Sequence, residues 1–135
     1  TMVGIANAMV NFVGSLNLSL GWFILAMVFV YIVLGMFMDV LSMQVATIPI
    51  TYPMAMAVGA DPIWFGIFIV LMSELAMITP PVGMNLYVIN GLSPDIHMSE
   101  VIRGVAPFIV LLGAFLILTM LFPAMSTWLP TRMNW

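Results

Sequence analysis

Charged residues are scarce in this sequence. Its 135 residues include only two basic and five acidic ones, whereas 64% of the chain is hydrophobic. A soluble globular domain carries about 25% charged residues, because its surface must be hydrated. This chain cannot assemble such a surface, so we expect lipid and neighbouring protein to surround it.

Other absences exclude further classes of protein. Cysteine is missing, which excludes disulfides and thiolate metal sites, and no basic patch is present that could follow a nucleic-acid backbone. The single histidine, His97, has no second ligand at metal spacing, so we interpret it as a surface residue. There is no phosphate-binding glycine loop, His-x-x-x-His pair or nucleophile elbow, which argues against an enzyme.

The first residues, Thr-Met-Val-Gly, are not a charged segment followed by an apolar one and a cleavage site. They therefore predict no signal peptide. We expect the chain to be a fragment of a longer permease.

The hydrophobic stretches predict an all-α integral membrane fold. A spanning helix needs roughly 20 apolar residues, and shorter runs suggest re-entrant segments. We predict five parts in chain order: a connecting or interfacial helix over 1–20, a re-entrant helical hairpin over 21–59, a broken transmembrane helix over 60–92, a hydrated loop over 93–104, and a terminal scaffold helix and tail over 105–135.

The hairpin is predicted from two apolar segments that are not clean spans. Residues 21–38 are strongly apolar, and residues 40–59 are interrupted by Pro49 and Pro53. Together they indicate a chain that enters the membrane, turns over residues 39–44 and returns.

The broken helix begins and ends with recognisable signals. Asp61 can accept hydrogen bonds from the first free N–H groups of a helix, and Pro62 suits the first helical position. The apolar stretch that follows stops at Thr79-Pro80-Pro81-Val82-Gly83 and resumes over 84–92. Proline removes a backbone donor and clashes with the preceding turn, so the two prolines forbid a continuous helix.

The last third contains the hydrated loop and the cleanest span. Ser93 or Ser99 can cap a short surface helix in the loop, and Arg103 weakly favours a cytoplasmic position. Residues 105–122 form an apolar run long enough to span. Aromatic and proline residues then indicate an interfacial exit: Pro123, Trp128, Pro130 and Trp135.

The break at 79–83 predicts an ion and substrate site. Irregular backbone in hydrocarbon leaves carbonyls and amides unpaired at high cost, and it is tolerated where they face protein, water or a ligand. In transporters, half-helix C-termini and unwound carbonyls bind Na⁺, and half-helix N-termini face anionic substrate groups. The alternative is that the two prolines only kink a packing helix.

The candidate residues come from the hairpin tip and the break. The predicted Na⁺ ligands are oxygens of Gly35, Asp39, Thr79, Pro80, Val82 and Gly83. The predicted substrate-binding residues are Ser42, Pro81 and Asn85.

Two acidic residues leave alternatives open. An acid in an apolar stretch is a functional candidate by default, but Asp39 could instead cap a helix at a membrane surface. Glu74 could help to neutralise a bound cation, or it could be protonated and hydrogen-bonded across a helix pair.

Four motifs occur in a characteristic order: Gly35-Met36-Phe37-Met38-Asp39, the hairpin with Pro49 and Pro53, Asp61-Pro62-Ile63-Trp64-Phe65-Gly66, and Ile78-Thr79-Pro80-Pro81-Val82-Gly83-Met84-Asn85-Leu86. With them the sequence resembles the C-terminal part of the large membrane subunit, of the DctM type, of tripartite ATP-independent periplasmic (TRAP) transporters. The resemblance covers nearly the whole chain.

This resemblance implies the second inverted repeat of a sodium-coupled, elevator-type secondary transporter in a bacterial or archaeal cytoplasmic (inner) membrane. It implies import of a small organic anion, such as a C4-dicarboxylate or sialic acid, with Na⁺ as coupling ion and no other cofactor. The implied partners are a small membrane subunit (DctQ type), a periplasmic substrate-binding protein (DctP type), the N-terminal remainder of the large subunit and membrane lipid, with no nucleic acid. Two alternatives remain open: another anion/Na⁺ symporter without a binding protein, or a membrane scaffold fragment without a ligand.

Overall fold

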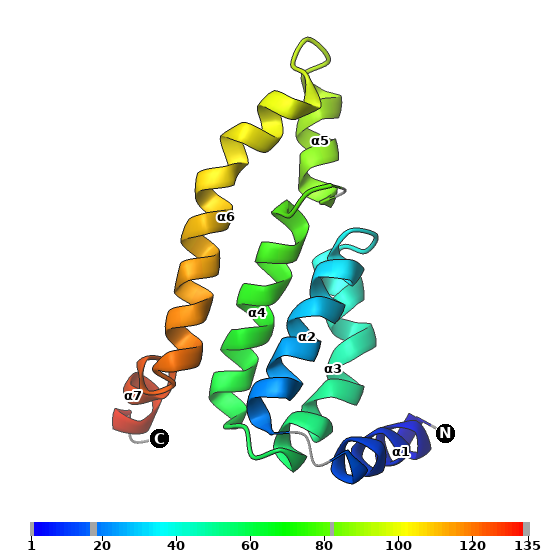
Figure 1. Ribbon diagram of the computed structural model, residues 1–135, viewed down its shortest axis with the longest axis vertical. Helices are drawn as coiled ribbons and strands as arrows, with labels where there is room; N and C mark the ends of the chain where they lie inside the picture. Colours follow the sequence, from blue (N-terminus) through cyan, green and yellow to red (C-terminus); the bar gives the residue numbers. More distant parts are fainter. Residues whose placement is uncertain (1, 17–18, 82, 134–135) are drawn as a thin grey trace.

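The computed structural model describes residues 2–16, 19–81 and 83–133. In this part of the chain every regular element is an α-helix: α1 (Met2–Ser15), α2 (Leu20–Gly35), α3 (Val40–Ala57), α4 (Pro62–Ile78), α5 (Met84–Leu92), α6 (Met98–Leu121) and α7 (Ala124–Arg132). Helices α2, α3, α4 and α6 run along the long axis, α5 continues beyond one end of α4, and α1 lies toward the opposite end of the molecule, beside α3 (Figure 1). The predicted all-α class is confirmed.

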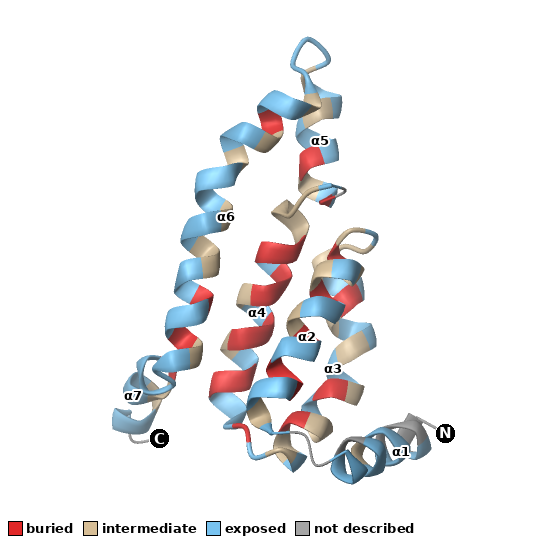
Figure 2. Ribbon diagram, in the orientation of Figure 1, coloured by how far each residue is buried: buried red, intermediate tan, exposed pale blue. Residues whose placement is uncertain are grey.

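Helix α4 forms the core. It contacts α2, α3, α5, α6 and α7, and Figure 2 shows buried residues along most of its length. Its rings of Trp64 and Phe68 stack with centroids 5.5 Å apart. Trp64 Nε1 donates to the carbonyl of Thr119 in α6 at 2.8 Å. The indole therefore packs in the core while its polar atom stays satisfied.

Asp61 begins α4 as predicted. Its Oδ1 accepts from the N–H groups of Ile63 and Trp64, each at 2.9 Å, and Pro62 occupies the first turn. The cap satisfies two of the four N–H groups that an α-helix leaves without internal partners.

Polar side chains join α2 to α3 within the hairpin, and they also join the hairpin to α4. Tyr31 Oη and Thr47 Oγ1 lie 2.6 Å apart, joining α2 to α3. Gln44 Nε2 donates to Ser73 Oγ at 3.3 Å, joining α3 to α4. Tyr31 and Ser73 are fully buried, so these bonds satisfy polar groups that water cannot reach.

The expected interruption of the second hairpin arm is wrong, because α3 runs continuously through Pro49 and Pro53. Each proline removes one N–H donor from the helical ladder, so the carbonyls of Val45 and Pro49 lose their helical donors, a loss that helices in apolar surroundings tolerate. The hydroxyls of Thr47 and Thr51 bond to other carbonyls of the same helix, those of Met43 at 2.8 Å and Thr47 at 3.0 Å.

The hydrated segment is also shorter than expected. Helix α6 begins at Met98, so only residues 93–97 connect it to α5, and Ser99 lies inside the helix. The carbonyl of His97 accepts from the N–H groups of Glu100 and Val101. Val101 is buried, which extends the packed part of α6 back toward α5 and leaves no separate surface helix.

Two helices, α3 with 18 residues and α6 with 24, are long and apolar enough to cross a membrane, while α2 and α4 are apolar but shorter. Pro107 lies inside α6 without ending it. The re-entrant character of the hairpin stays a prediction.

Helices α2 and α4 come close together where Gly35 meets Ala76. A Cβ added at Gly35 would overlap the Cβ of Ala76, and both residues are buried. Small residues at a helix contact allow two backbones to come close. The close approach therefore depends on the absence of a side chain at Gly35.

We predict that Gly35→Ala destabilises the full permease complex by about 1–3 kcal/mol, the usual cost of overpacking. Thermal unfolding of the purified complex in detergent measures the effect. The matched control is Gly104→Ala in α6, where an added Cβ meets nothing within 4 Å. Equal melting temperatures for the two variants would contradict a close contact at Gly35.

Candidate ion and anion site at the helix break

The two prolines of the break supply no backbone N–H donors to the end of α4. In an α-helix the carbonyl of residue i accepts from the N–H of residue i+4. The carbonyls of Ala76 and Met77 would need N–H groups from Pro80 and Pro81, and proline has none. The carbonyl of Ala76 accepts instead from Thr79 N at 3.4 Å. The carbonyl of Met77 stays without its helical donor.

Thr79 occupies the end of α4 with its hydroxyl turned back onto the helix. Thr79 Oγ1 donates to the carbonyl of Leu75 at 2.6 Å. A hydroxyl that donates its single proton keeps lone pairs with which it can accept a hydrogen bond or bind a cation. Thr79 is partly buried, so this oxygen is part of the junction rather than an open surface.

Gly83 closes the break against the end of α4. A Cβ at this position would lie 2.6 Å from the carbonyl oxygen of Met77 and 3.0 Å from that of Thr79. Its N–H donates to the carbonyl of Thr79 at 3.2 Å. Only glycine leaves room for so close an approach of backbone to backbone.

Two helix ends of opposite polarity thus meet within a few residues. Helix α4 ends at Ile78 and presents its carbonyls, and α5 begins at Met84 and presents its first N–H groups. The C-terminus of a helix carries a partial negative charge and the N-terminus a partial positive one. Asn85, partly buried, lies in the first turn of α5. Pro80 and Pro81, joined by a cis peptide bond, connect the two ends.

The hairpin tip is a tight turn over residues 36–39, earlier than the expected 39–44. Asp39 sets its end, because Asp39 Oδ2 accepts from Ser42 N at 3.1 Å and caps α3. The cap uses one of the two carboxylate oxygens. This geometry supports the helix-cap interpretation of Asp39, and it leaves the second oxygen for another role.

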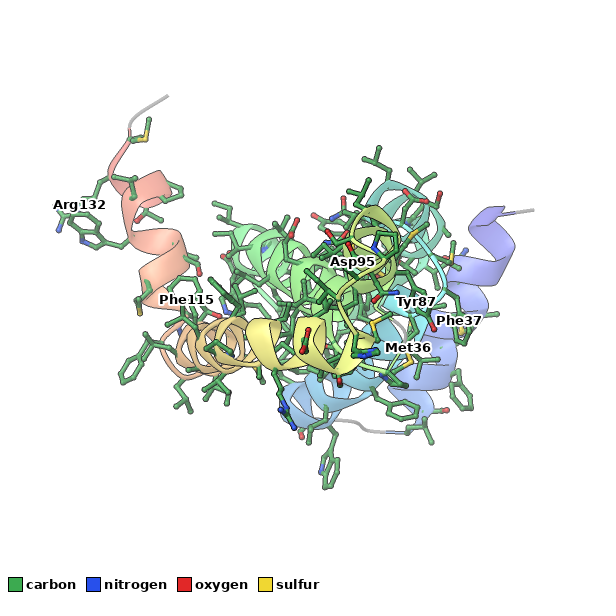
Figure 3. All side chains as sticks on the ribbon, turned by 90° about the horizontal axis from the view of Figure 1, so that it is seen from above. Met36, Phe37, Tyr87, Asp95, Phe115 and Arg132 are labelled. Atoms are coloured by element: carbon green, nitrogen blue, oxygen red, sulfur yellow. The ribbon has the colours of Figure 1, made fainter. Side chains whose placement is uncertain are left out.

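The break between α4 and α5 lies next to the tip of the α2–α3 hairpin. Gly35 contacts Ala76, which is three residues before Thr79. Figure 1 shows the α2–α3 turn beside the α4–α5 break, and in the view from above Met36, Phe37 and Tyr87 lie on one side of the molecule (Figure 3). The two irregular segments singled out from the sequence are therefore neighbours.

Some candidate residues are not joined directly. The hydrogen bonds of residues 19–81 and 83–133 do not connect Asp39 or Ser42 to the break. Val82, a candidate Na⁺ ligand, lies outside the described residues. Glu74 is exposed on α4, and it follows Ser73, which faces the hairpin.

No group of three or more histidine, aspartate or glutamate residues is gathered at one point in the described segments. The oxygens that the described residues offer at the break are those of the backbone and of the Thr79 hydroxyl, which are ligands that hard cations accept.

Sequence reasoning did not assign a role to the polar residues that hold the hairpin in place. Gln44, Thr47 and Thr51 follow one another at three- and four-residue spacing on a mostly apolar helix, and this spacing puts them on one face. That pattern is a usable signal. The partners, Tyr31 and Ser73, lie 16 and 29 residues away along the chain, and no local pattern identifies them.

Similarity to known proteins identifies the family of this chain. Residues 1–125 match the family model described as "Tripartite ATP-independent periplasmic transporter, DctM component". The chain is similar to the C4-dicarboxylate TRAP transporter large permease protein DctM of Pseudomonas aeruginosa, with 36% identity over 131 residues, 97% of this chain and 30% of that protein.

Two further relatives come from Vibrio cholerae. The C4-dicarboxylate TRAP transporter large permease protein DctM is 38% identical over 109 residues, 81% of this chain and 24% of that protein. The sialic acid TRAP transporter large permease protein SiaM is 38% identical over 97 residues, 72% of this chain and 22% of that protein. The chain thus spans less than a third of the length of these relatives.

This family consists of inner-membrane permeases, not enzymes, and the two helices of spanning length fit that location. The chain belongs to the DctM family, the large permease component of tripartite ATP-independent periplasmic transporters.

Proposed function

We propose that the hairpin tip and the α4–α5 break form half of a Na⁺ and carboxylate site in a sodium-coupled transporter that imports a small organic anion. The observation that carries this proposal is the carbonyl of Met77, which has lost its helical donor to Pro81 and lies against Gly83. The hairpin tip packs beside it through Gly35 and Ala76.

On the cation side, oxygen atoms gather at the negative end of α4. The carbonyl of Met77 and the hydroxyl oxygen of Thr79 have lone pairs available, and the backbone oxygen of Pro80 follows directly in the chain. Val82, the other candidate ligand of this segment, lies outside the described residues. Asp39 would add a formal negative charge from the hairpin. Na⁺ would bind here first and order the tip against the break.

On the anion side, the positive end of α5 would meet a substrate carboxylate through the backbone around Pro81 and the amide of Asn85, with Ser42 from the hairpin. The only two basic residues of the chain, Arg103 and Arg132, belong to α6 and α7, so neither is on the hairpin or the broken helix. A bound Na⁺ would therefore lower the electrostatic cost of placing an anion beside it. This dependence is the physical basis of coupled transport.

The wider assembly follows from the family. The relatives are named for C4-dicarboxylates and sialic acid, which supports a small carboxylate as substrate. Membership of a tripartite family favours a transporter with a periplasmic binding protein and a small membrane subunit over a symporter that works without them. The α2–α3 hairpin would be re-entrant and would move with the broken helix in an elevator step.

We predict that Thr79→Ala in the full transporter raises the Na⁺ concentration for half-maximal uptake. Loss of a bond to a charged group costs about 1.5–3 kcal/mol, or roughly 10- to 150-fold in affinity. This concentration is measured from sodium-dependent uptake into proteoliposomes, with the binding protein supplied. Thr79→Ser keeps the hydroxyl and should retain most of the sodium affinity.

Two substitutions of Asp39 distinguish its role as the cap of α3 from the role of its negative charge. Asp39→Asn keeps a good N-cap for α3 but removes the charge, so it should leave the melting temperature nearly unchanged while weakening sodium dependence. Asp39→Ala should lower the melting temperature and also weaken the sodium dependence of uptake. Wild-type sodium dependence in Asp39→Ala and Thr79→Ala together would overturn the assignment of the site.

We predict that Gly83→Ala abolishes most sodium-dependent uptake, because its methyl group would occupy the space beside the Met77 carbonyl. Gly91→Ala in α5, where an added Cβ meets nothing within 4 Å, is the matched control and should transport normally. Uptake rate and membrane abundance are measured together. Equal uptake by the two variants would show that the space at Gly83 is not used.

A further inference from the structure

Two hydrogen bonds between helices of this chain share one design. In each, a hydroxyl donates its single proton to a carbonyl of its own helix and accepts from a side chain on another helix. Thr47 Oγ1 donates to the carbonyl of Met43 at 2.8 Å, so the Tyr31 hydroxyl, 2.6 Å away, must be the donor to it. Ser73 Oγ donates in the same way to the carbonyl of Ile69 at 2.8 Å.

The second of these bonds joins the hairpin to the helix that carries the break. Ser73 is fully buried, and Gln44 Nε2 donates to its Oγ at 3.3 Å. Because the Ser73 proton is already used within α4, only a donor can pair with this oxygen, and the Gln44 carboxamide supplies it. Within residues 19–81, no other side-chain hydrogen bond joins the hairpin to α4. This bond therefore fixes which turn of α3 lies against α4.

From this bond a row of small residues on α4 leads to the break. Ser73, Ala76 and Thr79 follow one another at three-residue spacing, so each lies next to the one before it on the helix surface. Ser73 holds α3, and Ala76 lies against Gly35 of α2. Both arms of the hairpin are thus placed against the last two turns of α4, directly before the proposed Na⁺ ligand Thr79.

The same bond also places the acidic residue of the hairpin. Gln44 lies five residues after Asp39, about one and a half turns into α3. Its attachment to Ser73 sets the position of the Asp39 carboxylate along α4. We propose that Gln44 is a positioning residue for the Na⁺ site: its bond to Ser73 keeps the hairpin docked on α4 before Na⁺ binds. The proposal rests on the ion site described under the proposed function.

Loss of this bond lowers the fraction of transporters whose hairpin is docked, and the apparent sodium affinity falls with that fraction. Gln44→Leu should raise the Na⁺ concentration for half-maximal uptake about 2- to 12-fold, the range for one neutral hydrogen bond. Maximal uptake at saturating Na⁺ should stay near wild type. Both quantities are measured with the full transporter in proteoliposomes. A purely structural defect would lower abundance and maximal uptake without moving the sodium concentration.

The matched control is Tyr31→Phe, which removes a bond of the same design within the hairpin and leaves the contact with α4 in place. It should lower the melting temperature and leave the Na⁺ concentration for half-maximal uptake unchanged. Equal shifts of this concentration in Tyr31→Phe and Gln44→Leu would overturn the proposal. Gln44→Met, which keeps an unbranched side chain without the donor, serves if Gln44→Leu fails to fold.

A double-mutant cycle tests whether Gln44 acts through Ser73. Ser73→Ala should shift the sodium concentration as Gln44→Leu does. The double variant should be no worse than either single variant, because all three lose one shared bond. Multiplied effects in the double variant would show that the two residues act independently and would contradict the proposal.

A distance measurement separates failure of this proposal from failure of the ion site. Spin labels replace Leu41 on α3 and Ile63 on α4, which are 74% and 43% exposed, in the purified full transporter. Without Na⁺, Gln44→Leu should broaden the distribution of distances between the labels, and saturating Na⁺ should narrow it again.

The two failures give different results. An unchanged distribution in Gln44→Leu without Na⁺, with the sodium dependence of Thr79→Ala still weakened, would reject the role of Gln44 and leave the ion site standing. Broadening that saturating Na⁺ does not reverse, with wild-type sodium dependence in Thr79→Ala, would overturn the ion site and this proposal with it.

Discussion

The structure depends on one backbone constraint: in apolar surroundings every N–H and carbonyl needs a partner, and two consecutive prolines supply no N–H. Helix α4 carries most of the core, and it ends at Ile78 because the next donors in its ladder are missing. Thr79 satisfies two of the last carbonyls, one through its N–H and one through its hydroxyl. What remains is a short polar segment inside a mostly apolar bundle.

Packing decides where this polar segment sits. At one end of α4, the indole of Trp64 is fixed by its bond to the Thr119 carbonyl. Toward the other end, Gln44 bonds to Ser73 and Gly35 lies against Ala76. These contacts hold α2, α3 and α4 in one register, so the hairpin tip lies beside the break (Figure 1). A side chain at Gly35 would separate the two segments that the site needs together.

Local chemistry explains what the sequence could predict. The cap at Asp61 and the end of α4 before Pro80 depend on neighbouring residues only, and both are visible in the printed chain. The course of α3 was mispredicted because the cost of Pro49 and Pro53 depends on what else satisfies the helix. The start of α6 was missed because it depends on burial of Val101. The Gln44–Ser73 bond joins residues 29 apart, and no local rule pairs them.

Helix α4 carries the break at one end and two faces of different burial along its length. One face of α4 is buried by helices within this chain, and the face with Gly66, Val70 and Glu74 is not. The buried face holds the hairpin through Ser73 and Ala76, and both residues lie within about two turns of Thr79. The contacts that position the hairpin tip and the residues that end α4 therefore share one short stretch of the helix. A substitution that shifts this stretch would disturb the position of the tip and the geometry of the break together.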